Sequence, residues 1–244
     1  MVIDCIIQAR MTSSRLPGKV MIDFGGYPLL HHIICRLKKA HSLGRIIVAT
    51  SIDSTDDIIA DYCNRSNIFL FRGSMDDVLE RYYSAANHFE CENILRVTAD
   101  CPFIDALLID SAAEIFKRDS YDLFGLGGNF PDGLDFTFFT KQALHRAHNN
   151  AKLKSEREHV CLNMEKLENR TGAFEPFFNV QWLRLTLDEE RDYKMIAALY
   201  KIDERIFEMN FYDIFNLLNR HKEILDINSG IRRNEGLQKS TEND

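Results

Sequence analysis

Three cationic side chains, Arg10, Arg15 and Lys19, fall within ten residues that follow an apolar run at residues 2–7. The apolar run predicts a buried strand, and Gly18 after a proline predicts a turn. Arginine offers a planar fork of donors, lysine a compact charge, and glycine lets backbone N–H groups approach the same anion. This basic loop therefore suits a polyphosphate, although an ordinary strand-to-helix loop with solvated charges would have the same composition.

Two familiar phosphate-binding loops do not fit this segment. A Walker loop has glycine, four residues and then Gly-Lys-Ser/Thr, whereas here Ser13 stands five positions before Gly18 and Val20 follows Lys19. The spaced glycines of a dinucleotide fingerprint are also absent after the strand. The basic loop is thus of another kind.

A carboxylate follows a second apolar strand, predicted at residues 93–99. Asp100 stands where this strand ends. In parallel sheets ligands bind at the carboxyl ends of the strands, so we expect Asp100 at the same edge as the basic loop. A carboxylate there can hold magnesium against phosphate oxygens. The alternative is that Asp100 starts a turn or caps a helix beginning near Asp105.

Further polar candidates lie in the second half of the chain. Asp132 and Asp135 come just before an apolar strand, and they could hold acceptor hydroxyls or amides, or be turn residues. Arg157 could grip a carboxylate or phosphate of an acceptor. His159 could hydrogen-bond the same group or accept a proton, or be a capping or core histidine. Asp188 stands where a helix N-terminus favours acids, so capping alone would explain it.

The elements that position these residues alternate between strands and helices, which predicts an α/β fold with a mostly parallel sheet and right-handed crossovers. In the first half we expect strands at 2–7, 45–51, 68–71 and 93–99 and helices at 28–40, 55–63 and 76–90. In the second half we expect strands at 121–126, 136–139 and 179–187 and helices at 154–168, from about 188, and at 211–221.

Composition limits the classes of protein to consider. A chain of 244 residues with 45% hydrophobic and 27% charged residues has an ordinary soluble composition. The net charge of −7 argues against nucleic acid as a partner. No apolar run is long enough for a membrane span and no signal peptide is recognised, so we expect a cytoplasmic protein without a membrane partner. The six cysteines are widely spaced, and we expect them to be reduced and buried.

The residues around the basic loop resemble a known family. The string Gln8-Ala9-Arg10-Met11-x-Ser13-x-Arg15-Leu16-Pro17-Gly18-Lys19 is similar to the signature of the cytidylyltransferases, which include the CMP-Kdo and CMP-acylneuraminate synthetases. The branch of the spore coat polysaccharide biosynthesis proteins is the most similar. Five segments follow the order of the family's motifs: 8–19, 96–105, 131–135, 157–160 and 187–193.

The resemblance implies a fold and a division of the chain. The fold would be a Rossmann-like three-layer α/β sheet of the nucleotide-diphospho-sugar transferase type. A single nucleotidyltransferase domain would cover residues 1–231. Its parts would bind the nucleotide (1–120), bind the acceptor (121–185) and supply the metal element with closing helices (186–231). The polar tail at 232–244 is expected to be disordered.

The resemblance also assigns roles to residues. Asp100 and Asp188 would hold Mg²⁺, and Arg10, Arg15, Lys19 and Asp100 would be the catalytic residues. The nucleotide would lie against Gln8, Ala9, Arg10, Ser13, Ser14, Arg15, Gly18, Lys19, Arg72 and Ser74. The acceptor would lie against Asp132, Asp135, Arg157 and His159. Relatives commonly have glutamate two residues after the position of Asp135, and this chain has Thr137 there, so the acceptor could differ from theirs.

The function implied is transfer of CMP from CTP to a sugar acid or a related anionic acceptor for surface polysaccharide, with release of pyrophosphate. Three alternatives stay open: a nucleotidyltransferase with another base or a phosphorylated acceptor, a nucleotide-sugar glycosyltransferase, and a non-catalytic nucleotide-binding subunit. A glycosyltransferase usually has an Asp-x-Asp metal motif, which is absent here. A homodimer is a further option, because the second half has aromatics that could form either a dimer contact or core: Phe136, Phe138, Phe139, Phe177, Phe178 and Trp182.

Overall fold

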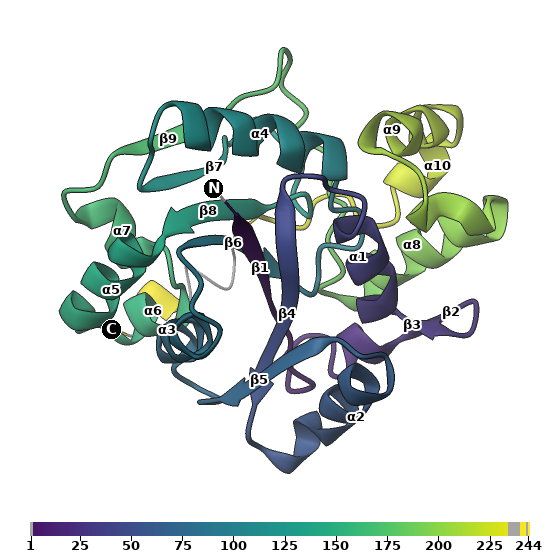
Figure 1. The fold of residues 1–244 in the computed structure, drawn as a ribbon. Coiled ribbons are helices and arrows are strands. Elements are labelled where there is room, and N and C mark those ends of the chain that lie inside the picture. The colour runs from purple at the N-terminus through teal and green to yellow at the C-terminus, as the bar shows by residue number, and fades with distance from the viewer. Residues whose placement is uncertain (1, 234–239, 243) are drawn as a thin grey trace.

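The centre of the fold is a twisted sheet (Figure 1). We analysed a computed structural model, which describes residues 2–233, 240–242 and 244. Among these residues the sheet has seven strands, in the order β5 (Phe69–Gly73), β4 (Leu43–Ser51), β1 (Ile3–Gln8), β6 (Asn93–Thr98), β8 (Phe136–Thr140), β7 (Leu123–Leu126) and β9 (Thr171–Phe174). All neighbours pair in parallel except β8, which is antiparallel to both of its neighbours. The expected mostly parallel sheet is confirmed.

Helices cover both faces of the sheet, and a small hairpin of β2 (Asp23–Phe24) and β3 (Tyr27–Pro28) lies beside it. Side chains of one face share a core with α1 (Leu29–Leu37), α2 (Asp57–Arg65), α4 (Ala106–Arg118), α8 (Glu190–Ile202), α9 (Phe211–Arg220) and α10 (Lys222–Leu225). The other face is covered by α3 (Val78–His88), α5 (Lys141–Asn150), α6 (Lys154–Glu158) and α7 (Leu162–Lys166). Short 3₁₀ turns lie at Lys19–Met21, Ser54–Asp56 and Glu204–Phe207.

Strand β1 shows why two layers of helices are needed. Cys5 and Ile7 pack in the first core, and Ile6 between them packs in the second. Because successive side chains of a strand point to opposite faces, a strand that is apolar at every position must be covered on both sides. The three-layer α/β fold implied by the sequence is confirmed, while the division of residues 1–231 into three parts stays a prediction.

The expected long strand at 179–187 is wrong. This segment is irregular and makes a single β-bridge, between Arg184 and Asp132. Its backbone donors go to loop carbonyls instead of a neighbouring strand, since Leu185 donates to Asp132 and Leu187 to Asp100. The apolar alternation of the segment reflects burial beneath those loops.

The expected helix at 154–168 is divided. Helix α6 ends before His159, whose backbone leaves the helical region, and α7 starts at Leu162. Val160 lies between them and packs in the second core. Burial of this one side chain outweighs the helical preference of the segment, which is a tertiary effect.

The tail at 232–244 was expected to be disordered, and its described residues contact the rest of the chain. Arg233 donates to the carbonyls of Gly128 and Phe130, and Ser240 donates to Glu158. These contacts connect described residues of the tail to the rest of the chain, and the expected disorder stays a prediction. The expectation for 234–239 and 243 lies outside the described residues.

The aromatics of the second half separate into two groups. Phe136, Phe138 and Phe139 of β8 are buried, whereas Phe177, Phe178 and Trp182 are exposed. Core packing therefore explains only the first group.

No helix in the described part of the chain is both long enough and apolar enough to cross a membrane.

Candidate active site

The basic loop closes on itself just after β1. The N–H of Gly18 donates to the carbonyl of Met11 at 2.8 Å, and Gly18 has a φ of +74°, a conformation that glycine adopts without strain. The N–H of Met11 in turn donates to Asp56 at 2.7 Å. The second carboxylate oxygen of buried Asp56 accepts from the N–H and hydroxyl of Ser51, at the end of β4. Asp56, which the sequence did not single out, thus fixes the loop to the sheet edge.

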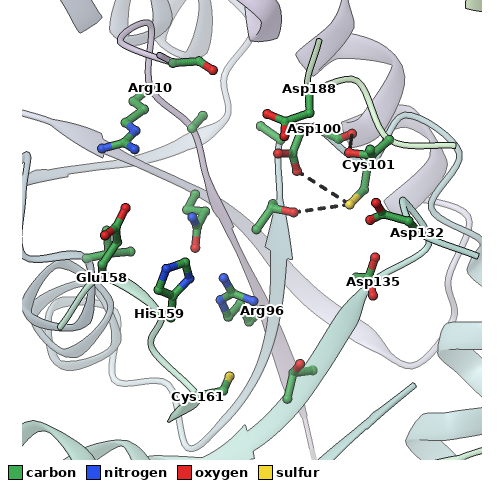
Figure 2. Close-up of a pocket in the computed structure, with 18 of the residues that line it drawn as sticks. Arg10, Arg96, Asp100, Cys101, Asp132, Asp135, Glu158, His159, Cys161 and Asp188 are labelled. Carbon is green, nitrogen blue, oxygen red and sulfur yellow. Dashed lines mark hydrogen bonds between the residues drawn. The ribbon is translucent and has the colours of Figure 1, made fainter. Parts of the chain in front are cut away.

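Asp100 and Asp188 come together at the same edge. The carbonyl of Asp100 accepts hydrogen bonds from the N–H of Leu187 at 2.8 Å and from the hydroxyl of Thr186 at 3.0 Å. These bonds hold the chain after β6 against the chain before α8. Two segments that are remote in sequence therefore place their carboxylates side by side, as Figure 2 shows.

Neither carboxylate serves as a helix cap. Asp105 caps α4, accepting from the N–H groups of Leu107 and Leu108. At the start of α8, Asp192 accepts from the N–H groups of Asp188 and Glu189. The capping explanation for Asp100 and Asp188 is thereby removed, because other side chains satisfy these helix termini.

Lys19 joins the basic loop to both carboxylates. Its ammonium nitrogen lies 2.8 Å from Asp100 and 2.8 Å from Asp188, and Arg15 also pairs with Asp188. Burial alone would raise the pKa of Asp100, but the charge and hydrogen bond of Lys19 lower it to about 2. Burial alone would lower the pKa of Lys19, and the two carboxylates raise it instead. Lys19 and Asp100 are therefore both charged near neutral pH.

These side chains line a cavity of about 790 Å³, a size typical of a ligand site. Figure 2 shows Arg10 on one side, the two aspartates on another, and His159 and Arg96 in between. The cavity is lined by most of the predicted site residues: Gln8, Ala9, Arg10, Ser13, Ser14, Arg15, Lys19, Asp100, Asp132, Asp135, His159 and Asp188.

The family assignment follows from a comparison with known proteins. Residues 5–229 match the family model described as cytidylyltransferase, which covers nearly the whole chain. The chain is a cytidylyltransferase family member. As such it belongs to the nucleotidyltransferases, enzymes that the resemblance of the basic loop had already implied.

Individual relatives agree with this assignment. The chain is 28% identical to the spore coat polysaccharide biosynthesis protein SpsF of Bacillus subtilis, over 89% of this chain and 94% of that protein. It is 25% identical to 3-deoxy-manno-octulosonate cytidylyltransferase 2 of Hydrogenovibrio crunogenus, over 87% of this chain and 77% of the relative. The solved structure of a cytidylyltransferase from Leptospira borgpetersenii superposes with a TM-score of 0.88 at 27% identity, covering 96% of this chain and all of that one.

A second pair of carboxylates, Asp132 and Asp135, lines the same cavity of this cytidylyltransferase as Asp100 and Asp188. Asp132 pairs with Arg184 at 2.6 Å, and Asp135 pairs with Arg233. Burial and the neighbouring charge of Asp135 raise the pKa of Asp132 to about 6. Gly133 between them has a φ of +99°, and a Cβ there would stand 2.2 Å from the backbone nitrogen of Thr186. Only glycine lets this turn pack so closely on the chain beside it.

His159 lies on another part of the cavity wall of the cytidylyltransferase. Its Nε2 is buried and has no hydrogen-bond partner among the described residues, so it is neither a cap nor a satisfied core histidine. Burial lowers its pKa. A largely neutral imidazole facing a cavity can hydrogen-bond a ligand, as the sequence predicts for an acceptor.

Four of the predicted site residues do not line the cavity. Gly18 shapes the basic loop from outside, and Arg72 donates to backbone carbonyls of Ser51 and Asp53. Ser74 accepts from the N–H of Asp77, just before α3. Arg157 pairs with Asp77 and donates to the carbonyl of His148. Arg157 thus joins α6 to α3, and the structure gives it no contact with the acceptor cavity.

Other cavity residues of the cytidylyltransferase were not singled out from sequence. Among them are Arg81, Arg96, Glu158, Arg184 and Arg233. Arg96 carried a signal, because it alternates with Thr98 and Asp100 along one face of a strand that is otherwise apolar. Arg184 and Arg233 carried none, since their roles depend on long-range packing of irregular segments.

The oxygen ligands at the sheet edge fit magnesium. Asp100 and Asp188 lie close enough to share one ammonium group, so one small cation can reach both. Magnesium in proteins is commonly bound by one or two carboxylates together with substrate phosphates. No group of three or more potential metal ligands occurs among the described residues.

Proposed function

We propose that this enzyme transfers CMP from CTP to a sugar acid or a related anionic acceptor, releasing pyrophosphate. The observation that carries the proposal is the meeting of the basic loop with Asp100 and Asp188 through Lys19, at the mouth of one cavity. Cations for a triphosphate and carboxylates for its metal are the two things that nucleotidyl transfer requires. The names of the relatives, with a sugar acid in one and a polysaccharide in the other, support the class of acceptor.

The basic loop would hold the triphosphate. Arg10 has no hydrogen-bond or ion-pair partner among the described residues, so its guanidinium is free for a phosphate. Arg15 and Lys19 would exchange part of their contact with the carboxylates for contact with phosphate oxygens. The loop is already closed by its own hydrogen bonds, so little order is lost on binding. Such preorganised charges are worth about 3 kcal/mol each at the transition state, or roughly a hundredfold in rate.

Asp100 and Asp188 would hold Mg²⁺. Bound there, the ion would supply positive charge for the α-phosphate and for the leaving pyrophosphate. Lys19 lies between the same carboxylates and would keep them ionised and close together before the ion arrives. The low pKa of Asp100 means that no proton has to be displaced at neutral pH.

The acceptor would occupy the remainder of the cavity. Its hydroxyl oxygen would attack the α-phosphorus in line, so that a new O–P bond forms while the bond to pyrophosphate breaks. Asp132 and Asp135 are the carboxylates placed to hydrogen-bond the acceptor's hydroxyls, and His159 offers an unpartnered ring nitrogen. The chain's own task is to bind and orient, which can supply a large part of such a barrier.

Pyrophosphate release tests the proposal. Each of the four nucleoside triphosphates is combined with magnesium and a panel of sugar acids, sugar phosphates and phosphonates. We expect release with CTP and a sugar acid. Release with another nucleotide or with a phosphorylated acceptor would show that the enzyme catalyses the same reaction on those substrates. No release in any combination would contradict the enzymatic proposal. Sugar release from a nucleotide sugar would instead indicate a glycosyltransferase.

We also propose a homodimer. The exposed aromatics Phe177, Phe178 and Trp182 follow β9 at the outer edge of the sheet. Large exposed apolar side chains are typical of contact surfaces. A second copy of the chain is the partner that we propose for these side chains.

A further inference from the structure

One arginine that lines the cavity, Arg96, has no role in the site described above. Arg96 lies on β6, in register with Ile6 of β1 and with Thr137 of β8. Its side chain is on the same face of the strand as those of Ile94, Thr98 and Asp100, because the side-chain period of a strand is two. Ile94 is buried in the second core, whereas Arg96, one step further, lines the cavity (Figure 2). Arg96 therefore forms the floor where the core ends.

Arg96 has no direct partner for its charge, although neighbouring groups that include Cys161, Tyr82 and Asp100 raise its pKa against the effect of burial. No described residue forms a hydrogen bond or ion pair with it, and its Nε is buried without a partner. Buried Arg36 shows the ordinary arrangement, since its guanidinium donates to four backbone carbonyls, of Phe103, Ile104, Phe207 and Met209. Arg96 is only partly buried, so the desolvation cost falls on the part of the guanidinium, including Nε, that lies away from water without a partner. Its presence in a cavity is explained if a ligand supplies the missing anion.

The carboxylates of the cavity aspartates are already engaged. Asp100 and Asp188 pair with Lys19, Asp132 pairs with Arg184, and Asp135 pairs with Arg233. None of these aspartates is paired with Arg96. Among the described residues Arg96 therefore has no direct partner, and an anion bound in the cavity could supply one.

The position of Arg96 indicates which ligand this is. It lies two residues before Thr98, which ends the strand, and so about 7 Å below the sheet edge where the basic loop meets Asp100. The triphosphate would lie at that edge, and the acceptor would fill the floor. We propose, on the basis of the proposed function, that Arg96 binds the negatively charged oxyacid group of the acceptor, a carboxylate or a phosphoryl group, with His159 Nε2 as a second polar contact.

Thr137 leaves this charge available. It stands directly opposite Arg96 on β8, and such cross-strand neighbours have Cβ atoms about 5 Å apart. A glutamate at 137 would reach the guanidinium and neutralise it. Threonine is uncharged, and its side chain is too short to reach the guanidinium of Arg96. The pair of Arg96 with Thr137 thus makes the cavity floor cationic.

Four variants test the proposal. Arg96→Met removes the charge, Arg96→Lys keeps it without the fork, Thr137→Glu would neutralise it, and Thr137→Gln is the uncharged control of equal length. With the acceptor found by pyrophosphate release, we expect Arg96→Met and Thr137→Glu to raise the acceptor KM on the order of a hundredfold. Arg96→Lys should raise the acceptor KM less than Arg96→Met does. Thr137→Gln should raise the acceptor KM far less than Thr137→Glu does. The Kd of CTP should stay within about twofold in all four.

Two results would overturn the proposal. One is an unchanged acceptor KM in Arg96→Met together with equal effects of Glu and Gln at position 137. The other is a weakened Kd for CTP, which would place Arg96 at the triphosphate. The melting temperature supplies a further readout, because loss of an unpaired cation should leave it unchanged or higher, and a marked fall would indicate a structural role. If Arg96→Met does not fold, the comparison of Thr137→Glu with Thr137→Gln still tests the proposal.

Failure of the proposed function can be told apart from failure of this inference. If no acceptor is turned over, binding of pyruvate, a carboxylate, and of methylphosphonate, a phosphoryl analogue, is measured calorimetrically with CTP and magnesium present. Binding that is lost in Arg96→Met and Thr137→Glu but kept in Thr137→Gln supports the anion site, and the better probe identifies the oxyacid class. Absence of binding to the wild-type protein, or binding that survives in Arg96→Met, contradicts it.

Discussion

Asp100 and Asp188 share one ammonium group, that of Lys19, which lies 2.8 Å from each. The arrangement links the basic loop, the end of β6 and the start of α8 before any substrate is bound. Without Lys19, two carboxylates would face each other at the edge of the cavity and repel. The cation therefore stabilises the same geometry that nucleotide and metal would use.

Replacement of Lys19 should cost both stability and nucleotide affinity. Lys19 is buried, so in Lys19→Met the carboxylates lose their partner, and we expect unfolding to require about 3 kcal/mol less at pH 7. In the wild type, Asp100 has a pKa of about 2, below its ordinary 3.8, so its stabilising contribution is present above pH 4 and is lost as the pH falls towards 2. Urea unfolding should show this acid-side loss reduced in Lys19→Met. Equal pH profiles would contradict the assignment.

Asp132 should show the opposite pH dependence. Its pKa in the folded chain is about 6, above its ordinary 3.8, so between these values the folded state holds a proton that the unfolded state has lost. The stability of the wild type should therefore fall as the pH rises through this window, by at most about 3 kcal/mol from this group. Asp132→Asn cannot ionise, and it should gain stability relative to the wild type between pH 4 and pH 7. The measurement is urea unfolding at intervals of pH, and parallel curves would refute the prediction.

Gly133 should tolerate no side chain. Its φ of +99° is unfavourable for alanine, and the added Cβ would meet the backbone of Thr186 at 2.2 Å. We expect Gly133→Ala to lower the free energy of unfolding by about 2 kcal/mol or more and to displace Asp132. Gly128→Ala is the matched control, because a Cβ there would meet nothing within 4 Å. Similar stabilities of the two variants in thermal unfolding would show that the close approach is not important.

The exposed aromatics give a prediction about assembly. If Phe177 and Phe178 form the contact of a homodimer, the double variant Phe177→Ser, Phe178→Ser should sediment as a monomer at concentrations where the wild type is a dimer. Tyr212→Ser changes an equally exposed aromatic on α9 and should leave the dimer intact. A monomeric wild type throughout the micromolar range would exclude this role.

Most regular elements of the first half could be predicted from the sequence, whereas α5 and β9 of the second half were missed. Strands β1 and β6 and helix α1 were recognised because their patterns are local. The segment at 179–187 was misassigned, since its alternating apolar residues are buried under loops whose carbonyls, at Asp132 and Asp100, accept its backbone donors. A pattern of burial does not reveal which backbone groups pair.

The site divides in the same way. The basic loop and Asp100 follow strands directly, so their common edge could be predicted from topology. Asp188 could be assigned to the site only through the family resemblance, because its acid-rich setting equally suited a helix cap. The structure shows that Asp192, not Asp188, accepts the backbone N–H groups at the start of α8. Arg157 was predicted to bind the acceptor, and this stays a prediction, since in the structure it pairs with Asp77 and does not line the cavity. Asp56 and Arg233 act through tertiary contacts that sequence patterns do not contain.

The central claim is that Asp100 and Asp188, with the basic loop, form the site of nucleotidyl transfer. The most direct measurement is detection by mass spectrometry of the CMP-linked acceptor made from CTP and magnesium, by the wild type and by Asp100→Asn, with circular dichroism to confirm that the variant is folded. We predict product from the wild type and a loss of at least about a hundredfold in rate in the variant. Undiminished product formation by a folded Asp100→Asn would contradict the account.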